Sequence, residues 1–446
     1  MAASAAETGD DPDAGIGIFL GTPAADTNDS GNAATISANQ GRQFWQSSDG
    51  EDPFRRLPDE LLRHVLSFLQ PDHALQTCVL DTRWRDLWRR ETSLNLNSYD
   101  YGLKSEAWKR FKRIVNLVIK VRGNSPLKCC VLTSFSGDKD AELWVKYALT
   151  CQVKCLKVRS DYLGLPLRYD DAPFISQHLK ILNFFNAKFQ GSSLDFSNCP
   201  ALHNLKMAHC FIHASTISSE SLKHLCITTF SKFPRDSHVR IVAPNLITLQ
   251  LDGFEGLTPS LGHMQSLIEA YVGLSSDCGD FCSINGQGCE DQHCACHAYP
   301  AGEGVLLNGL SSAVSLELIG NTKTFIYRWD LKWCPIFEKL KTLLLNEWFR
   351  AIDLVCILQH SPILEMLTLQ LGNTENLVGA TGVEEAMEQS FVCAHLKVVN
   401  IECKEVDAGV HKILTILRTC GILRDHISIK ALSSPSYYFS FQKDKA

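Results

Sequence analysis

The feature that most restricts the fold of this chain is an apolar pattern that recurs through its C-terminal two thirds. The pattern is L-x-x-L-x-L, in which Val, Ile, Met, Phe or Ala sometimes replaces Leu. Its successive copies begin at Val153, Leu179, Leu202, Leu222, Leu246, Leu267, Ala313, Leu340, Leu364 and Leu396. They start 20 to 32 residues apart, except for one gap of 46 residues after Leu267. A period of this length indicates leucine-rich units that bury their apolar residues only by stacking on their neighbours.

Each copy of the pattern predicts a short strand whose alternate side chains face the core, followed by a return segment on the other side. Proline precedes several copies, as in Cys199-Pro200, Ala243-Pro244 and Ser361-Pro362, where it removes no ladder donor. We therefore predict an α/β leucine-rich-repeat solenoid: an arc of short parallel strands with helical or irregular convex returns. The alternative is two unrelated α/β domains with leucine-rich strands.

The residue between the last two apolar positions of each copy is expected on the concave face of such an arc. The predicted target-binding residues are Asn183, Lys206, Gln250, Tyr271, Glu317, Thr368 and Asn400, and Cys226 and Leu344 occupy the same position in their copies. This row is chemically mixed and indicates no ligand class.

Residues 53–96 have a different character, because three short helical segments follow one another. A Leu-Pro pair and two acids open the first, where Pro and negative charge suit the start of a helix. Pro71 ends it, a second segment runs through Cys78, and a third contains Trp84 and is capped by Asp81 or Thr82. A unit this small is marginal alone, so we expect a partner to cover part of its apolar surface.

The runs LPDELLRHVLSFL and CVLDTRWRDLW resemble the F-box of plant F-box proteins, although Asp81 and Thr82 stand where relatives usually have a small hydroxyl residue and a basic residue. The later runs LKTLLLNEW, ILQHSPILEMLTLQL and AHLKVVNIECKEVDAGVHKIL are similar to the C-terminal, FBD-like region of many plant F-box/leucine-rich-repeat proteins. The alternative for the first two runs is an unrelated helical hairpin.

The resemblance implies a substrate-recognition subunit of a Skp–cullin–F-box ubiquitin ligase. A Skp-type adaptor would join it to cullin and RING subunits, and an unknown target protein would bind the repeats. The residues that the resemblance implies for the adaptor contact are Leu57, Pro58, Leu61, Leu62, Val65, Leu66, Leu69 and Trp84. Some of these must instead hold the three helices together. Two alternatives stay open, which are an interaction scaffold without a role in ubiquitination and a zinc-containing repeat receptor; small-molecule sensing is neither supported nor rejected.

These boundaries predict seven segments along the chain. They are a disordered N-terminal tail (1–50), the F-box (51–96), a linker and helical cap (97–150), leucine-rich repeats (151–275), a Cys-rich insertion (276–304), further repeats with the FBD-like region (305–430) and a C-terminal tail (431–446).

Composition and motifs exclude several classes of function. A net charge of −6 argues against nucleic-acid or anionic-membrane partners, and no apolar run is long enough for a membrane span. No phosphate-binding glycine loop, nucleophile elbow or helical His-Glu-x-x-His is present. We therefore expect no enzyme activity, no cofactor and no metal. The first fifty residues lack the basic region of a signal peptide, so we expect the protein in the cytoplasm, the nucleus or both.

Two clusters of side chains allow more than one interpretation. Cys278, Cys282, Cys289, His293, Cys294, Cys296 and His297 have spacings from which a zinc site could be built, but their close crowding favours a reduced loop, with redox-linked disulfides as a third interpretation. Lys109, Arg110, Lys112 and Arg113 suggest either a nuclear-import or anion-binding patch or, as we prefer, the solvated side of an amphipathic helix.

Overall fold

The computed structural model describes residues 54, 56–69, 71–77, 82–101, 105–134, 139–160, 166–169, 174–275, 277–280, 294, 304–372, 374, 377 and 391–431. The chain divides into two compact units, residues 1–57 and 58–446, and the helices and strands below belong to the second. The predicted tail 1–50, the predicted tail beyond Ala431, Cys78, Asp81 and most of the Cys-rich insertion lie outside the described residues.

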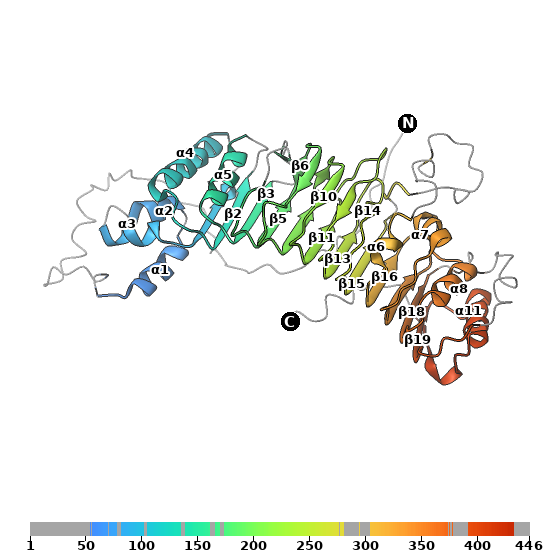
Figure 1. Cartoon of the computed structure of the whole chain (residues 1–446). Coiled ribbons are helices and arrows are strands. Elements are labelled where there is room, and N and C mark those ends of the chain that lie inside the picture. Colours follow the sequence, from blue (N-terminus) through green and yellow to red (C-terminus); the bar gives the residue numbers. More distant parts are fainter. Residues whose placement is uncertain are drawn as a thin grey trace, which may run out of the picture. The chain divides into compact units, whose positions relative to one another are not determined.

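A single parallel sheet carries the repeats, and thirteen of its strands are described (Figure 1). In sheet order they are β1 (Ser93–Asn97), β2 (Cys129–Ser134), β3 (Cys155–Ser160), β5 (Ile181–Phe185), β8 (Asn204–Ala208), β11 (His224–Thr228), β13 (Thr248–Asp252), β15 (Glu269–Gly273), β16 (Ser315–Ile319), β17 (Thr342–Asn346), β18 (Met366–Leu371), β19 (Val398–Cys403) and β20 (Ile427–Ala431). Sheet order follows chain order, so each repeat pairs with the next. The predicted α/β leucine-rich-repeat fold is confirmed.

The predicted apolar pattern is the buried face of this sheet. Its middle positions form one register row that is at most 2% exposed: Leu156, Leu182, Leu205, Leu225, Leu249, Ala270, Leu316, Leu343, Leu367 and Val399. Burial of a leucine side chain is worth about 1.5–3 kcal/mol, and the row shares this burial across every repeat junction. Each repeat is therefore stabilised by packing against the neighbouring repeats and not by its own contacts alone.

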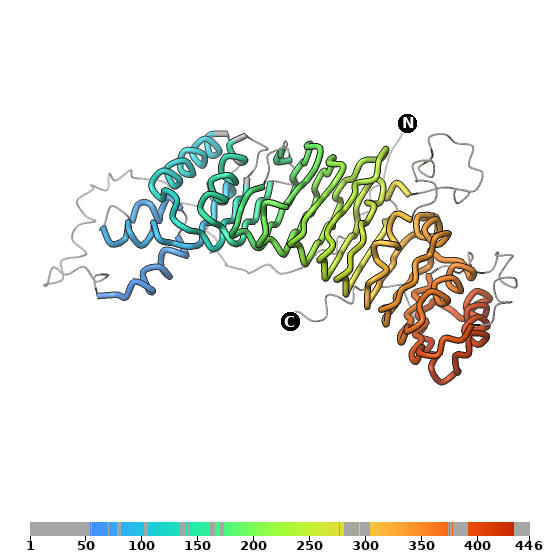
Figure 2. Tube along the Cα trace, in the orientation of Figure 1, coloured from blue at the N-terminus to red at the C-terminus, as the bar shows by residue number. Residues whose placement is uncertain are grey.

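The return segments differ along the chain, as the Cα trace shows (Figure 2). Helices α4 (Ser105–Arg122) and α5 (Lys139–Thr150) serve the first repeats, and α6 (Leu307–Leu310), α7 (Ile326–Asp330), α8 (Ala351–Gln359) and α11 (Ala408–Thr419) serve the last. The middle returns are short strands, which were not predicted. They form one sheet of β7 (Ser193–Asp195), β10 (Thr216–Ser218), β12 (Arg240–Val242) and β14 (Ser260–Leu261), and another of β4 (Leu167–Tyr169), β6 (Ala187–Phe189) and β9 (Phe211–Ile212).

The sheet also begins earlier and ends later than the leucine pattern. The interval expected as a linker and helical cap holds α4 and α5 as its helices, but it also holds β2, which pairs with β1 and β3. Strand β20 extends the other end by pairing with β19. The leucine pattern does not reveal β1 and β20 because Glu91 and Arg424 stand where the first leucine of the repeat would be. Strand β2 does follow a leucine, Leu127, but Cys130 takes the place of the second leucine.

Left-handed residues end four successive strands in the middle of the sheet. Asn186, His209, Thr229 and Gly253 directly follow β5, β8, β11 and β13, and their φ angles lie between 49° and 57°. The amide of Asn186 donates to Ala208 at 3.0 Å and that of His209 to Thr229 at 2.9 Å, so the ladder continues into the turn. Asn and His tolerate this conformation better than most residues, and glycine tolerates it best.

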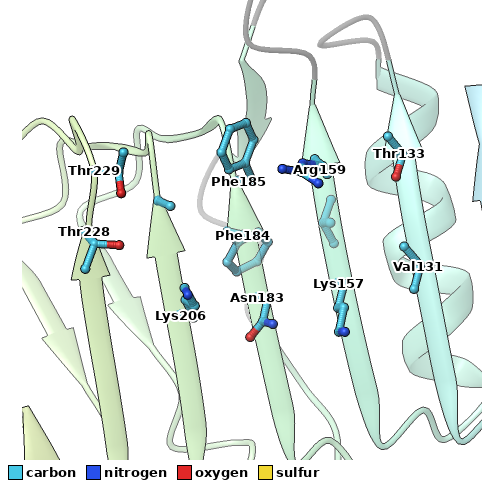
Figure 3. Close-up of a pocket in the computed structure, with 12 residues that line it drawn as sticks. Val131, Thr133, Lys157, Arg159, Asn183, Phe184, Phe185, Lys206, Thr228 and Thr229 are labelled. Atoms are coloured by element: carbon cyan, nitrogen blue, oxygen red, sulfur yellow. The ribbon is translucent and has the colours of Figure 1, made fainter. Parts of the chain in front are cut away.

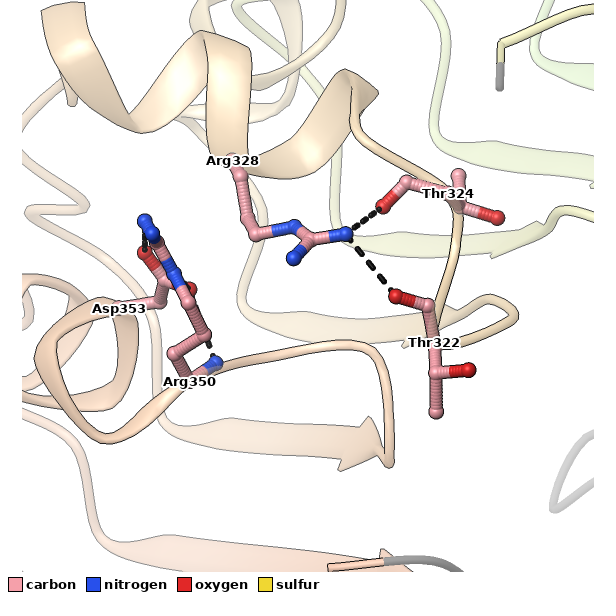
Figure 4. Close-up of polar contacts among 5 residues, drawn as sticks. All are labelled: Thr322, Thr324, Arg328, Arg350 and Asp353. Atoms are coloured by element: carbon pink, nitrogen blue, oxygen red, sulfur yellow. Dashed lines mark hydrogen bonds and ion pairs between the residues drawn. The ribbon is translucent and has the colours of Figure 1, made fainter. Parts of the chain in front are cut away.

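One buried arginine organises the turn between β16 and α7. Arg328 is 7% exposed, and its Nη2 donates to the carbonyl oxygens of Thr322 at 3.0 Å and Thr324 at 2.9 Å (Figure 4). Desolvation lowers the pKa of its guanidinium. Nearby, Arg350 and Asp353 form a capping box at the start of α8, with 3.0 Å between Nε and Oδ2. These contacts hold turns whose sequences carry no apolar repeat position.

None of the described helices combines the length and apolarity that a bilayer crossing requires.

Candidate binding surfaces

The first candidate surface lies on helix α1 (Asp59–Ser67), which precedes α2 (Pro71–Thr77) and α3 (Thr82–Arg89). Asp59 and Glu60 occupy the first turn, where carboxylates suit the positive end of the helix dipole. Arg83 on α3 forms an ion pair with Asp59 on α1, with 2.6 Å between Nη2 and Oδ1. This pair links the N-terminal ends of α1 and α3.

The predicted adaptor-contact residues separate into two groups. Leu62, Leu66 and Trp84 are at most 3% exposed, so they form the core among the helices and cannot contact a partner in this arrangement. Leu57 and Leu69 are half-buried, and Pro58 is exposed at the start of α1. Leu61 is 50% exposed and Val65 is 38% exposed. The structure thus leaves the second group, and not the first, available for binding.

Phe68, directly after α1, was missed by the sequence reasoning. Its side chain is 74% exposed, and its ring meets that of His64 edge-on at 4.7 Å. Leu61, Val65 and Phe68 fall at positions i, i+4 and i+7, which share one helical face. We call these three residues the α1 stripe. The spacing could have revealed Phe68, because it continues the face that Leu61 and Val65 begin.

The second candidate surface is the face of the large sheet opposite the core. The register aligns the predicted target-binding residues in one row, with Lys157 preceding Asn183 and Ser428 following Asn400. From β3 to β20 the members of the row are Lys157, Asn183, Lys206, Cys226, Gln250, Tyr271, Glu317, Leu344, Thr368, Asn400 and Ser428, and Val131 and Asn95 continue it on β2 and β1. Lys157 was missed although it fills the same position in its own copy of the pattern.

Two members of this row are not accessible to a target. Tyr271 and Glu317 are each 5% exposed, which corrects the expectation that they line the binding face. For Tyr271 the reason lies at Gly273, where an added Cβ atom would stand 2.8 Å from the hydroxyl oxygen of the tyrosine. The tyrosine ring therefore lies along its own strand over the glycine and does not project outward. Desolvation raises the pKa of nearby Asp252 to about 6.

The predicted basic cluster lies on α4, and the amphipathic-helix interpretation is confirmed. Phe111 is buried against the rings of Trp108 and Trp144, whereas most of the cations are paired with acids. Lys109 pairs with Glu106 at 2.8 Å, and Arg110 pairs with Asp72 on α2 at 3.2 Å. Lys112 pairs with Asp140. Carboxylates therefore neutralise most of this cluster.

Of the possible zinc ligands in the Cys-rich insertion, only Cys278 and Cys294 are described. Cys278 is 3% exposed, its thiol donates to Asp280 at 2.8 Å, and burial raises its pKa. Elsewhere in the described part of the chain, Cys334, Cys356 and His360 place three donor atoms within 4.8 Å of one another. The His360 Nδ1 lies 2.8 Å from the Cys356 carbonyl oxygen, so that nitrogen is engaged by the backbone.

Comparison with known proteins supports the resemblance to plant F-box proteins. The F-box domain matches residues 54–95, the segment that contains α1, α2 and α3. An F-box/LRR-repeat protein of Arabidopsis thaliana is 25% identical over 72% of this chain and 77% of its own length. This chain is an F-box/leucine-rich-repeat protein, similar to those of plants.

Two other relatives of this F-box/leucine-rich-repeat protein extend the comparison. The meiotic F-box protein MOF of rice (Oryza sativa subsp. japonica) is 28% identical over 79% of this chain and 80% of its own length. An FBD-associated F-box protein of Arabidopsis thaliana is 30% identical over 43% of this chain and 38% of its own length. The similarity to the rice protein therefore covers most of the length of both chains.

Proposed function

We propose that this F-box/leucine-rich-repeat protein is the substrate-recognition subunit of a Skp–cullin–F-box ubiquitin ligase and has no catalytic groups of its own. The α1 stripe carries this proposal. Its three apolar side chains lie on one helical face and form an apolar surface that a partner would remove from water. Their place within the matched F-box makes a Skp-type adaptor the expected partner.

The second half of the function is target capture by the repeat sheet. The register row is long enough to contact an extended segment of another protein, because neighbouring strands lie about 4.8 Å apart. With the adaptor on α1 and the target on the sheet, a target lysine is held near a ubiquitin thioester carried by other subunits. The gain in rate comes from effective concentration, not from acid–base chemistry of this chain.

The test is capture of a purified Skp-type adaptor by the full chain. Leu61→Asp with Val65→Asp places charge on the α1 stripe and should reduce adaptor binding by at least about tenfold, because desolvating an unpaired carboxylate is costly. Leu143→Asp with Leu423→Asp is the matched control, since both leucines are more than half exposed and lie outside the F-box.

Adaptor binding that persists in the α1 variant, or that fails in the folded wild-type chain, would contradict the proposal. Binding of the adaptor without incorporation into a complex that transfers ubiquitin would instead identify an interaction scaffold.

A further inference from the structure

The sheet face contains a hollow of about 420 Å³ over strands β2, β3, β5, β8 and β11. Lys157, Asn183 and Lys206 line it from three adjacent strands, and Arg159 and Phe185 line it nearer the carboxyl ends of β3 and β5 (Figure 3). Its volume is within the range of sites that hold a small ligand or a few side chains of a peptide.

Three cations in this hollow lack a neutralising partner in the described part of the chain. Lys157, Arg159 and Lys206 are exposed, and none forms an ion pair with a carboxylate among the residues that the structure describes. Other lysines of the repeats do have such partners: Lys232 pairs with Glu255 at 2.8 Å and Lys341 with Glu365 at 3.1 Å. Like charges gathered without a counter-ion raise the local concentration of anions.

The guanidinium of Arg159 is held in place by aromatic contacts. It lies 4.6 Å from the centre of the Phe185 ring, and that ring lies 4.8 Å from the ring of His209. His209 is one of the left-handed residues, and its backbone amide donates a hydrogen bond to the Thr229 carbonyl oxygen. A cation stacked on an aromatic wall loses less conformational entropy when an anion binds.

A further atom of the hollow indicates a peptide. The Asn183 Oδ1 is buried and has no hydrogen-bond partner among the described residues. Leaving a buried amide oxygen without a hydrogen-bond donor costs about 1–3 kcal/mol of free energy. A ligand that brings a donor to this oxygen would remove that cost. A peptide supplies a backbone N–H beside an acidic side chain, whereas a fully ionised inorganic anion supplies no donor.

The cations of the hollow are not repeated on the next strands of the same register rows. Asp252 lies on β13 and Glu402 on β19, and the next lysine in these rows is Lys430 on β20. The cations of β3 and β8 are therefore the ones that an acidic segment would meet in the hollow.

We propose that this hollow binds an acidic segment of the target protein, whose carboxylate or phosphate is held by Lys157, Arg159 and Lys206 while a backbone N–H donates to Asn183. The proposal rests on the proposed function, because it names the chemistry of the segment that the repeats would capture.

The test measures binding of fluorescent degenerate peptide pools to the full chain, both alone and in the presence of a Skp-type adaptor. The pools share one length and differ at a fixed central residue, which is phosphoserine, glutamate, serine or lysine. We expect the phosphoserine or glutamate pool to bind more tightly than the serine and lysine pools. Whichever of these two pools binds more tightly shows whether the hollow prefers phosphate or carboxylate. Binding should weaken as salt rises, because the cations are exposed.

Lys157→Glu with Lys206→Glu should reduce this binding by at least about tenfold, because two charge-assisted contacts become repulsive. The matched control is Lys154→Glu with Lys180→Glu, which changes the same charge at two exposed lysines just before β3 and β5. It should bind like the wild type.

Equal binding of all pools, no binding, or unchanged binding in the Lys157/Lys206 variant would overturn the inference. Tighter binding of a short single-stranded RNA than of either acidic pool would overturn it too. Adaptor capture is measured on the same variants, because it should be normal in all of them. Loss of adaptor capture with intact acidic-peptide binding would refute the ligase role alone.

Discussion

The side chain of Asn346 and the backbone of Gly320 form a closed pair of hydrogen bonds. The Asn346 Nδ2 donates to the Gly320 carbonyl oxygen at 2.7 Å, and the Gly320 amide donates to the Asn346 Oδ1 at 2.8 Å. Asn346 ends β17 and is 2% exposed, whereas Gly320 directly follows β16. The pair therefore satisfies the backbone where two repeats leave the sheet.

Asn346→Asp should lower the free energy of unfolding by about 1–3 kcal/mol or more, because the carboxylate cannot donate and the Gly320 oxygen stays buried without a partner. Urea denaturation measures the change. Asn308→Asp is the control at an exposed asparagine, where the change should stay within about 0.5 kcal/mol. Equal stability of the two variants would show that the pair contributes little.

The two faces of α1 should respond oppositely to truncation. Leu62 is fully buried, so Leu62→Ala should destabilise the protein by about 2–5 kcal/mol. Leu61 is half exposed, so Leu61→Ala should cost little stability but weaken adaptor binding. Thermal denaturation and adaptor capture measure the two effects. The assignment of the faces is wrong if Leu61→Ala unfolds the protein while Leu62→Ala leaves its stability unchanged.

The stability of the chain should depend on the ionisation of His209. Burial, and then the charge of Arg159, lower the pKa of this imidazole below its usual value of 6.5. The unfolded chain then binds the proton more tightly than the folded chain, so stability is lost as pH falls through about 6.5 toward the folded-state pKa. His209→Asn, which tolerates the left-handed backbone, should flatten this part of the pH profile of unfolding. An unchanged slope would exclude His209 as its source.

Removal of the neighbouring cation gives an independent reading of the same group. Arg159→Gln should raise the pKa of His209, as followed by NMR of the imidazole protons, because a repulsive charge is lost. A pKa that stays constant would mean that burial alone sets it.

Cys356 should be more reactive near neutral pH than the other half-buried cysteines with raised pKa. A hydrogen bond from the Cys334 side chain, followed by the charge of His360, lowers the pKa of Cys356 to about 7, against the opposing effect of burial. Alkylation by iodoacetamide, followed by mass spectrometry, should show a rate that rises through this pH. Cys334→Ala should move the rise to higher pH. Cys226, whose pKa is raised by burial, is the reference and should react more slowly.

The repeat register could be predicted from the sequence because it depends on period alone. Each leucine of the pattern must face the core, and a slip of one residue would turn the whole strand outward. The period is therefore sufficient to place Asn183, Lys206 and Thr368 in one row. Strands β1 and β20 could not be recognised in this way, because short alternating runs without the leading leucine resemble many loops.

The exposure of individual side chains could not be predicted in the same way. Tyr271 fits the outward position, yet the space over Gly273 allows its ring to fold back along the strand. Leu61 and Leu62 are adjacent leucines in the sequence, but only the packing of α3 on α1 determines that Leu62 is buried. The gathering of Lys157, Arg159 and Lys206 requires strands that are distant in the chain to be aligned.

Strands β15 and β16 pair residue for residue from Glu269 with Ser315 to Gly273 with Ile319, although the Cys-rich insertion separates them in the chain. The junction is fixed by this strand pairing and by Asp280, which is fully buried and accepts hydrogen bonds from the backbone amides of Thr258 and Phe325. A sequence inserted after Asp280, such as an epitope or a reporter domain, would leave these contacts and the recognition face in place.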